Sequence, residues 1–226
     1  MGKILILGAG LMQKKAILSA KKIAKAVVID KNPFAPCVSL SDEFYPVDLK
    51  DKEGILSLAK KLSEGDDKLI GIFTAGTDFS SSVSYAAEKL NLPCHSYISS
   101  LNASDKKRMR KIFQEKHIPS AKFISFSKDN YSFSSAQNFA LSLGFPVVVK
   151  PSDNMGSRGC RIAENSFELE KAVEESFKFS SSKTVIIEEF LDGKEFSIDA
   201  LVYEDSFTVT GFASRHIFYP PYFIEM

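Results

Sequence analysis

The sequence predicts an α/β fold in which a parallel sheet is covered by helices on both faces. Short apolar runs alternate with amphipathic stretches in the N-terminal part of the chain, and only short turns separate them. This alternation is typical of parallel strands joined by crossover helices. The composition agrees with a folded globular protein, because 44% of the residues are hydrophobic and 25% are charged.

The N-terminal elements follow from the hydrophobic periodicity. Apolar runs predict strands, and apolar residues at helical spacing predict amphipathic helices. The strands are expected over 3–7, 26–29 and 69–73, and the helices over 11–24, 52–62 and 79–90. Because parallel sheets bind ligands at the carboxyl ends of their strands, the loops at 8–12, 30–33 and 74–78 are candidate binding segments.

A second unit is expected to begin at residue 102, which divides the chain into 1–101 and 102–226. A basic helix over about 105–116 opens this unit, with Asn102 or Ser104 as its N-cap. Further strands are expected over 123–126, 146–150, 161–163 and 184–187, further helices over 134–143 and 167–179, and antiparallel strands within 195–212. This mixture predicts an α+β unit.

Charge and cysteine content exclude several classes of protein. Lysine and arginine exceed aspartate and glutamate by a net charge of only +1, so there is no basic excess for coating a nucleic acid. No apolar run approaches the roughly 20 residues of a membrane span. The three cysteines are widely spaced and form no CxxC pair, which favours a reducing cytoplasm over a disulfide or zinc framework.

A glycine turn after the first strand offers one nucleotide-binding hypothesis. Gly8 and Gly10 follow the strand over 3–7, and Asp30 ends the next strand, as in the dinucleotide-binding fingerprint. The third glycine of that fingerprint is absent, because Gln13 occupies its place. A dinucleotide-dependent oxidoreductase is therefore kept as an alternative function.

A stronger constellation begins at Lys150, which ends an apolar strand. The loop after it contains Gly156, Arg158 and Gly159, so its backbone amides can surround phosphate oxygens while Lys150 supplies a point charge. A later apolar strand ends in a pair of acids and a turn, over 185–195, which suits an adenosine. Together these segments predict a site for a polyphosphate nucleotide.

The chain resembles the ATP-grasp ligases, which include carbamoyl phosphate synthetase large chains, biotin carboxylases and carboxylate–amine ligases. The resemblance covers about 102–212 and is carried by Asp105-Lys106, Ile118-Pro119-Ser120, Gly144 to Pro151, Met155 to Gly159, Glu188 to Leu191, and Gly193-Lys194-Glu195. It implies a Rossmann-like pre-ATP-grasp domain over 1–101, followed by an incomplete ATP-grasp domain with an ATP-binding subdomain over about 122–190.

The resemblance also implies roles for individual residues. Lys106 and Lys150 match the cations that contact the ATP phosphates, and Met155, Gly156, Ser157, Arg158 and Gly159 match the loop that closes over the triphosphate. Glu188, Glu189, Phe190 and Leu191 match the adenine-binding segment, and Glu195 matches the ribose-binding acid. Because the two acids Glu188 and Glu189 point to opposite sides of a strand, one of them is expected to be structural. Lys150, Arg158 and Arg215 are the candidate catalytic residues.

The implied function is that of an ATP- and Mg²⁺-dependent ligase. ATP would activate a small carboxylate as an acyl phosphate, which an amine or a similar nucleophile then attacks. The family's metal-binding acids are expected beyond Met226, so phosphoryl transfer by a chain that ends there is expected to fail, which keeps a non-catalytic nucleotide-binding module open. An incomplete final sheet with an exposed edge also makes a homodimer an expected assembly.

Overall fold

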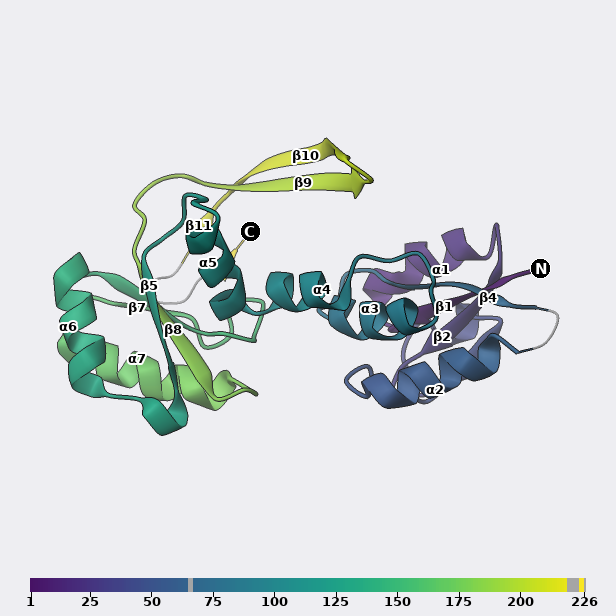
Figure 1. Ribbon diagram of the computed structural model, residues 1–226, viewed down its shortest axis with the longest axis horizontal. Coiled ribbons are helices and arrows are strands. Elements are labelled where there is room, and N and C mark those ends of the chain that lie inside the picture. Colours follow the sequence, from purple (N-terminus) through teal and green to yellow (C-terminus); the bar gives the residue numbers. More distant parts are fainter. Residues whose placement is uncertain (65–66, 219–223, 226) are drawn as a thin grey trace. The chain divides into compact units, whose positions relative to one another are not determined.

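The computed structural model describes residues 1–64, 67–218 and 224–225, and it confirms the α/β fold (Figure 1). The chain divides into two compact units, Met1–Ser104 and Asp105–Met226. Among the helices described in the structure, none combines the length and the apolar content that a bilayer crossing requires.

The first unit is built on a parallel sheet with the strand order β3-β2-β1-β4. Its strands are β1 (Lys3–Leu7), β2 (Lys25–Ile29), β3 (Glu43–Tyr45) and β4 (Leu69–Thr74). Its helices are α1 (Lys14–Ala20), α2 (Lys52–Leu62), α3 (Ser80–Lys89) and α4 (Tyr97–Ser104), with 3-10 turns at Leu11–Gln13 and Val38–Leu40.

Alternation along the central strand explains why both faces of this sheet are covered. Leu5 and Leu7 of β1 pack into the cluster that α2 and α3 complete, whereas Ile6 packs with Ile17 of α1. Successive side chains of a strand point to opposite faces, so one apolar run supplies two cores. The predicted parallel sheet is therefore present, with buried apolar layers on each side.

In this part of the chain two local predictions were wrong, and two elements were not predicted. The helix expected over 11–24 is confined to α1 and the short 3-10 turn before it, because the chain turns after α1 to bring Lys25 into the sheet. Strand β3 and helix α4 were not predicted, because β3 is too short for a periodic pattern and α4 is rich in serine. The N-cap of the next helix is Asp105, whose carboxylate accepts a hydrogen bond from Arg108 N, and not Asn102 or Ser104.

The second unit contains an antiparallel sheet with the strand order β5-β8-β6-β7. The strands are β5 (Phe123–Ser127), β6 (Val147–Pro151), β7 (Arg161–Ala163) and β8 (Thr184–Glu189). The helices are α5 (Lys106–Glu115), α6 (Phe133–Leu143) and α7 (Ser166–Phe179), with a 3-10 turn at Lys128–Asn130.

One face of this sheet is the core of the second unit. Val147 and Val149 of β6 and Val185 and Ile187 of β8 are fully buried and pack in one cluster with residues of α6 and α7. The alternate residues of the same strands must point to the other face. That second face carries Lys150 and Glu188, so the burial of the apolar residues fixes where these charged groups lie.

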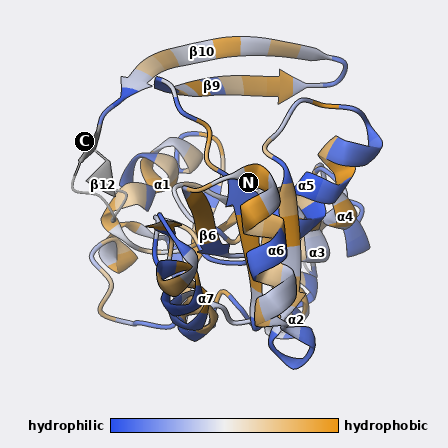
Figure 2. Cartoon of the chain, turned by 90° about the vertical axis from the view of Figure 1, so that its left-hand side faces the viewer, coloured by the Kyte–Doolittle hydropathy of each residue, from blue (hydrophilic) through white to orange (hydrophobic). Residues whose placement is uncertain are grey.

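A long hairpin follows, formed by β9 (Glu195–Tyr203) and β10 (Ser206–Arg215). Figure 2 shows apolar residues along both of its strands. The register places one apolar set on a single exposed face: Phe196, Ile198, Ala200, Val202, Phe207, Val209 and Phe212. An irregularity between Val209 and Gly211 interrupts the pairing. The last strands are β11 (Ile217–Phe218) and β12 (Ile224–Glu225).

Candidate functional site

The site starts from a diagonal pair on the second face of the antiparallel sheet. Val148 lies opposite Glu188 and Lys150 lies opposite Ile186, so Lys150 and Glu188 are diagonal neighbours on the same face. Side chains so placed on adjacent strands are within reach of each other when they are long. The Nζ of Lys150 contacts Oε2 of Glu188. Strand register alone therefore creates this ion pair.

A second cation reaches the same carboxylate from α5. Nε of Arg110 donates to Oε1 of Glu188 at 2.6 Å, and Nη2 of Arg110 lies 3.4 Å from Oε2. The Glu188 side chain is 3% exposed, and those of Arg110 and Lys150 are 18% and 19% exposed. Sequence reasoning missed Arg110. Its spacing of one helical turn from Lys106 was the available signal, because residues i and i+4 share a helix face.

The two cations keep the buried carboxylate ionised. Burial raises the pKa of Glu188, but the hydrogen bond from Arg110 and the charge of Lys150 outweigh that effect and lower the pKa below its usual value. The described surroundings therefore hold two cations against one carboxylate. The uncompensated positive charge is the electrostatic feature that an anionic ligand requires.

Lys106 adds a third cation at the start of α5. Its backbone N donates to the carbonyl of Ser152 at 3.0 Å, and Ser152 Oγ donates to the Asp105 cap at 2.7 Å. Its Nζ donates to the carbonyl of Asn154. Burial and the nearby charge of Lys150 lower the pKa of the Lys106 amine. The start of α5 is thus fastened to the loop that follows β6.

That loop is anchored at both ends. Asp153 accepts hydrogen bonds from Ser180 Oγ at 2.7 Å and from Ser182 N at 2.6 Å, at the turn between α7 and β8. At the other end, Ser176 Oγ of α7 donates to the carbonyl of Gly159 at 2.6 Å. Between these anchors the loop is exposed, with Met155 at 48%.

The conformation of the loop requires glycine at two positions. Gly156 and Gly159 have φ values of +65° and +75°, and Ser157 also adopts a positive φ of +56°. Residues with side chains seldom adopt such angles, whereas glycine does so freely. In the loop, Arg158 Nε donates to the carbonyl of Met155 at 3.2 Å.

We expect Gly159→Ala to destabilise the second unit by about 2 kcal/mol, because backbone strain and a steric clash add together. A Cβ at this position would lie 2.8 Å from Cβ of Phe179. Gly156→Ala is the matched control: it has a similar φ but no heavy atom within 4 Å, so about 1 kcal/mol of strain alone is expected. Thermal unfolding of the two variants measures the difference, and equal losses would contradict the clash.

The remaining predicted residues occupy different surroundings. Glu189 accepts a hydrogen bond from Lys122 N at 3.2 Å, on the strand face opposite to Glu188. Leu191 is 65% exposed after the end of β8. Glu195 and Arg215 form an ion pair with each other at 3.6 Å, across the first residue pair of the hairpin.

The glycine turn of the first unit is occupied by its own side chains. Asp30 accepts a hydrogen bond from Ala9 N at 3.0 Å, and Gln13 accepts one from Gly10 N at 2.9 Å. A Cβ on Gly8 would lie 3.2 Å from the Gln13 side chain. The groups that a dinucleotide would use are thus engaged in holding the turn, which favours a structural role.

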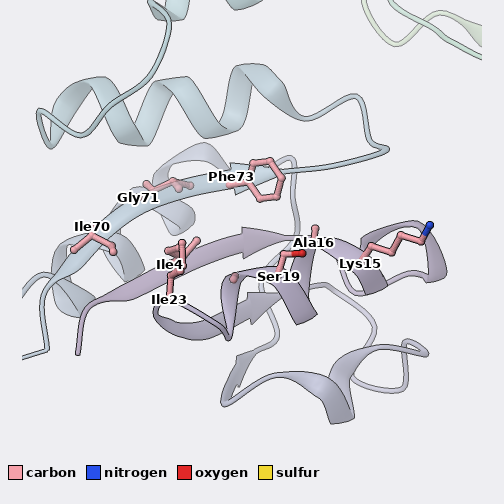
Figure 3. Close-up of a pocket in the computed structure, with 10 residues that line it drawn as sticks. Ile4, Lys15, Ala16, Ser19, Ile23, Ile70, Gly71 and Phe73 are labelled. Atoms are coloured by element: carbon pink, nitrogen blue, oxygen red, sulfur yellow. The ribbon is translucent and has the colours of Figure 1, made fainter. Parts of the chain in front are cut away.

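An apolar groove of about 540 Å³ lies on the same unit, beside β4 (Figure 3). Its wall includes Ile4, Ile23, Ile70 and Phe73, and among the lining residues that the structure describes Lys15 has the only charged side chain. A binding site for a small polar molecule needs several converging polar groups. The described lining of the groove lacks such groups, so we place the candidate site at the three cations of the second unit.

Comparison with known proteins identifies relatives of this chain. The family model described as the ATP-grasp (A) domain of phosphoribosylglycinamide synthetase matches residues 104–217. Formate-dependent phosphoribosylglycinamide formyltransferase from Prochlorococcus marinus subsp. pastoris is 27% identical over 194 residues. The enzyme of the same name from Nitratiruptor sp. is 27% identical over 196 residues. In both cases the alignment covers 84% of this chain and 48% of the relative, so the chain spans about half the length of these relatives.

Solved structures show the same fold. Phosphoribosylglycinamide synthetase from Anaerococcus prevotii has a TM-score of 0.68 and 23% identity, and the match covers 99% of this chain and 54% of that one. An L-amino acid ligase from Bacillus licheniformis has a TM-score of 0.77 and 20% identity, covering 100% of this chain and 53% of that one. A biotin carboxylase domain dimer from Hydrogenobacter thermophilus, solved with MgADP and bicarbonate, has a TM-score of 0.77 and 20% identity. The match covers 95% of this chain and 50% of that one.

The family match spans half of the chain and contains every residue of the cationic site, from Lys106 to Glu188. The resemblance noted from the sequence is confirmed. The chain belongs to the ATP-grasp family, through the ATP-grasp (A) domain of the phosphoribosylglycinamide synthetases.

Proposed function

We propose that this chain is the ATP-binding part of an ATP-dependent ligase. The observation that carries the proposal is the pairing of Arg110 and Lys150 with one buried carboxylate, Glu188, beside a glycine loop that Lys106 also contacts. Lys106 and Lys150 would bind phosphate oxygens of ATP, and the exposed amides of 155–159 would close over them. Arg158 would join from the loop.

The adenosine would bind where β8 ends. Backbone groups of Phe190 and Leu191 are the proposed contacts of the adenine ring, with Glu188 and Glu189 beside them, and Glu195 would accept hydrogen bonds from the ribose hydroxyls. Main-chain groups suit the adenine because its edge offers one donor beside one acceptor. Arg215, paired with Glu195, is proposed to face the reacting groups.

The proposed reaction is the activation of a small carboxylate. Its oxygen attacks the γ-phosphorus of ATP, ADP leaves, and the acyl phosphate is then attacked by an amine that expels phosphate. Lys150, Arg158 and Arg215 would stabilise the charge on the transferring phosphoryl group. Among the described residues no group of three or more His, Cys, Asp or Glu side chains could hold a metal ion, so we assign no Mg²⁺ ligand to them.

Titration of the chain with a fluorescent MgATP analogue tests the proposal. Saturable binding that unlabelled MgATP displaces is the expected result. Binding of NADH that is lost in Asp30→Ala would instead favour the dinucleotide-dependent oxidoreductase. ATP hydrolysis that requires an added carboxylate would distinguish a ligase from a nucleotide-binding module without turnover.

The pH dependence of MgATP binding offers an independent check. Only the protonated form of Lys106 attracts phosphate, and its pKa lies below the ordinary 10.5 through burial and the charge of Lys150. Affinity should therefore begin to fall at a pH below the one at which an ordinary lysine loses its charge, and Lys106→Arg should remove that early fall, because arginine stays charged. The exposed Lys111→Arg is the control, and an equal slope in Lys106→Arg would contradict the assignment.

Two further aspects stay predictions. A cytoplasmic location is favoured by the three cysteines, Cys37, Cys94 and Cys160, all of which are free thiols. A homodimer is tested by sedimentation velocity at several protein concentrations.

A further inference from the structure

The Glu188 carboxylate is shared unequally by its two cations. Arg110 reaches both of its oxygens, with Nε 2.6 Å from Oε1 and Nη2 3.4 Å from Oε2, whereas Lys150 contacts Oε2 alone. Arg110 is planar, always charged and able to bind a carboxylate through two nitrogens, while lysine is a single point charge on a flexible stem. The two cations therefore differ in how easily each can leave Glu188.

We infer that Arg110 is a positioning residue of the phosphate site, which holds Glu188 so that Lys150 can exchange this carboxylate for a phosphate oxygen. The inference rests on the proposed function, because it presumes that Lys150 binds the nucleotide. It assigns to Arg110 no contact with ATP.

The cost of stranding a buried charge is the reason for this arrangement. Glu188 is 3% exposed, so it cannot regain water when Lys150 moves away. A buried carboxylate without a cation is strongly unfavourable. The free energy lost in this way would weaken nucleotide binding. With Arg110 in place, both carboxylate oxygens keep a donor after the amine has left. Lys150 is then free at little cost.

The position of Arg110 on a helix supports a fixed role. Its guanidinium lies 5.9 Å from the ring centre of Phe113, one turn further along α5. The first turn of α5 is fastened by Asp105 and Ser152. Burial raises the pKa of Glu188, and the hydrogen bond from Arg110 is the largest effect that lowers it again. Arg110 is thus the principal partner of the carboxylate.

A double-mutant cycle on MgATP binding tests the inference with the full chain. We expect Arg110→Ala to weaken MgATP binding about tenfold, the size of one lost charge-assisted hydrogen bond. In a Glu188→Gln background, the same substitution should change affinity by less than about twofold, because no carboxylate remains to be held. Equal losses in both backgrounds would show that Arg110 binds the nucleotide directly, and no loss in either would remove its role altogether.

Two further variants keep the test decisive. Arg108→Ala removes an exposed arginine of the same helix and should leave MgATP affinity unchanged. Arg110→Lys retains the charge and folds more readily than Arg110→Ala, yet it cannot bind both oxygens in parallel, so a loss of about threefold is expected. Binding by Arg110→Lys equal to that of the original chain would overturn the inference.

The cycle separates this inference from the proposed function. If the unmodified chain fails to bind MgATP, the proposed function is wrong. If it binds MgATP and loses binding in Lys150→Met, while Arg110→Ala and Arg110→Lys both bind normally, only the role of Arg110 is wrong.

Discussion

Lys150→Met should weaken MgATP binding about a hundredfold, the largest effect on affinity expected for a single substitution in this chain. Lys150 is the cation that ends β6, and its amine lies beside the Glu188 carboxylate on the face away from the core. Methionine retains the unbranched stem and removes only the charge. Isothermal titration with MgATP measures the loss.

The fold should survive this substitution, because Glu188 keeps its hydrogen bonds to Arg110. Lys178→Met, an exposed lysine near the end of α7, is the control and should bind MgATP normally. A Lys150→Met variant that binds MgATP as tightly as the control would remove Lys150 from the phosphate site.

Glu188→Ala should have the largest effect on stability, lowering the free energy of unfolding of the second unit by about 3 kcal/mol. The substitution leaves Arg110 and Lys150, whose side chains are less than one-fifth exposed, without the carboxylate that pairs them. Chemical denaturation followed by a probe within the second unit measures this loss. Glu189→Ala is the matched control: its carboxylate makes one hydrogen bond on the other strand face, so a loss below about 1 kcal/mol is expected.

The loss of stability in Glu188→Ala should depend on pH. Burial raises the pKa of Glu188, but the opposing effect of Arg110 and Lys150 is larger, so the pKa lies below its usual value. A carboxyl group with a lowered pKa stabilises the folded state above the pKa of the unfolded chain, and loses this contribution as the pH falls through the folded value. The stability difference between the original chain and Glu188→Ala should therefore be largest near neutral pH and shrink in acid. A difference that is constant with pH would contradict an ionised Glu188.

Local pattern was sufficient for most of the fold. The helix predicted over 52–62 is α2 with the same bounds, and the strand over 161–163 is β7. Both are fixed by signals within a few residues, such as the Asp51 cap of α2. The antiparallel strands within 195–212 were predicted for the same reason, because alternation is a local property.

What the sequence did not predict depends on distant partners. In the sequence, Arg110 is one of several charges on a basic helix. Its partner Glu188 lies 78 residues further along the chain, so no local pattern indicates their contact. Strand β3 has three residues and exists by pairing with β2. The engagement of Asp30 by Ala9 likewise requires the sheet that brings the two loops together.

The irregularity in the hairpin changes the parity of β10. Val209 lies opposite Ala200 and Gly211 lies opposite Asp199, so Thr210 is an extra residue without a cross-strand partner. Beyond it, odd and even positions exchange faces, which is why Phe212 lies with Val209 on the apolar side. There the Phe212 ring stacks on the Phe196 ring, with 5.1 Å between the ring centres. Pairing Thr210 into a regular ladder would therefore turn the rest of the strand over, whereas deleting Thr210 would leave Gly211 opposite Asp199 and Phe212 on its present face. In this hairpin the irregularity at Thr210 is what allows Val209 and Phe212, three positions apart, to share one face.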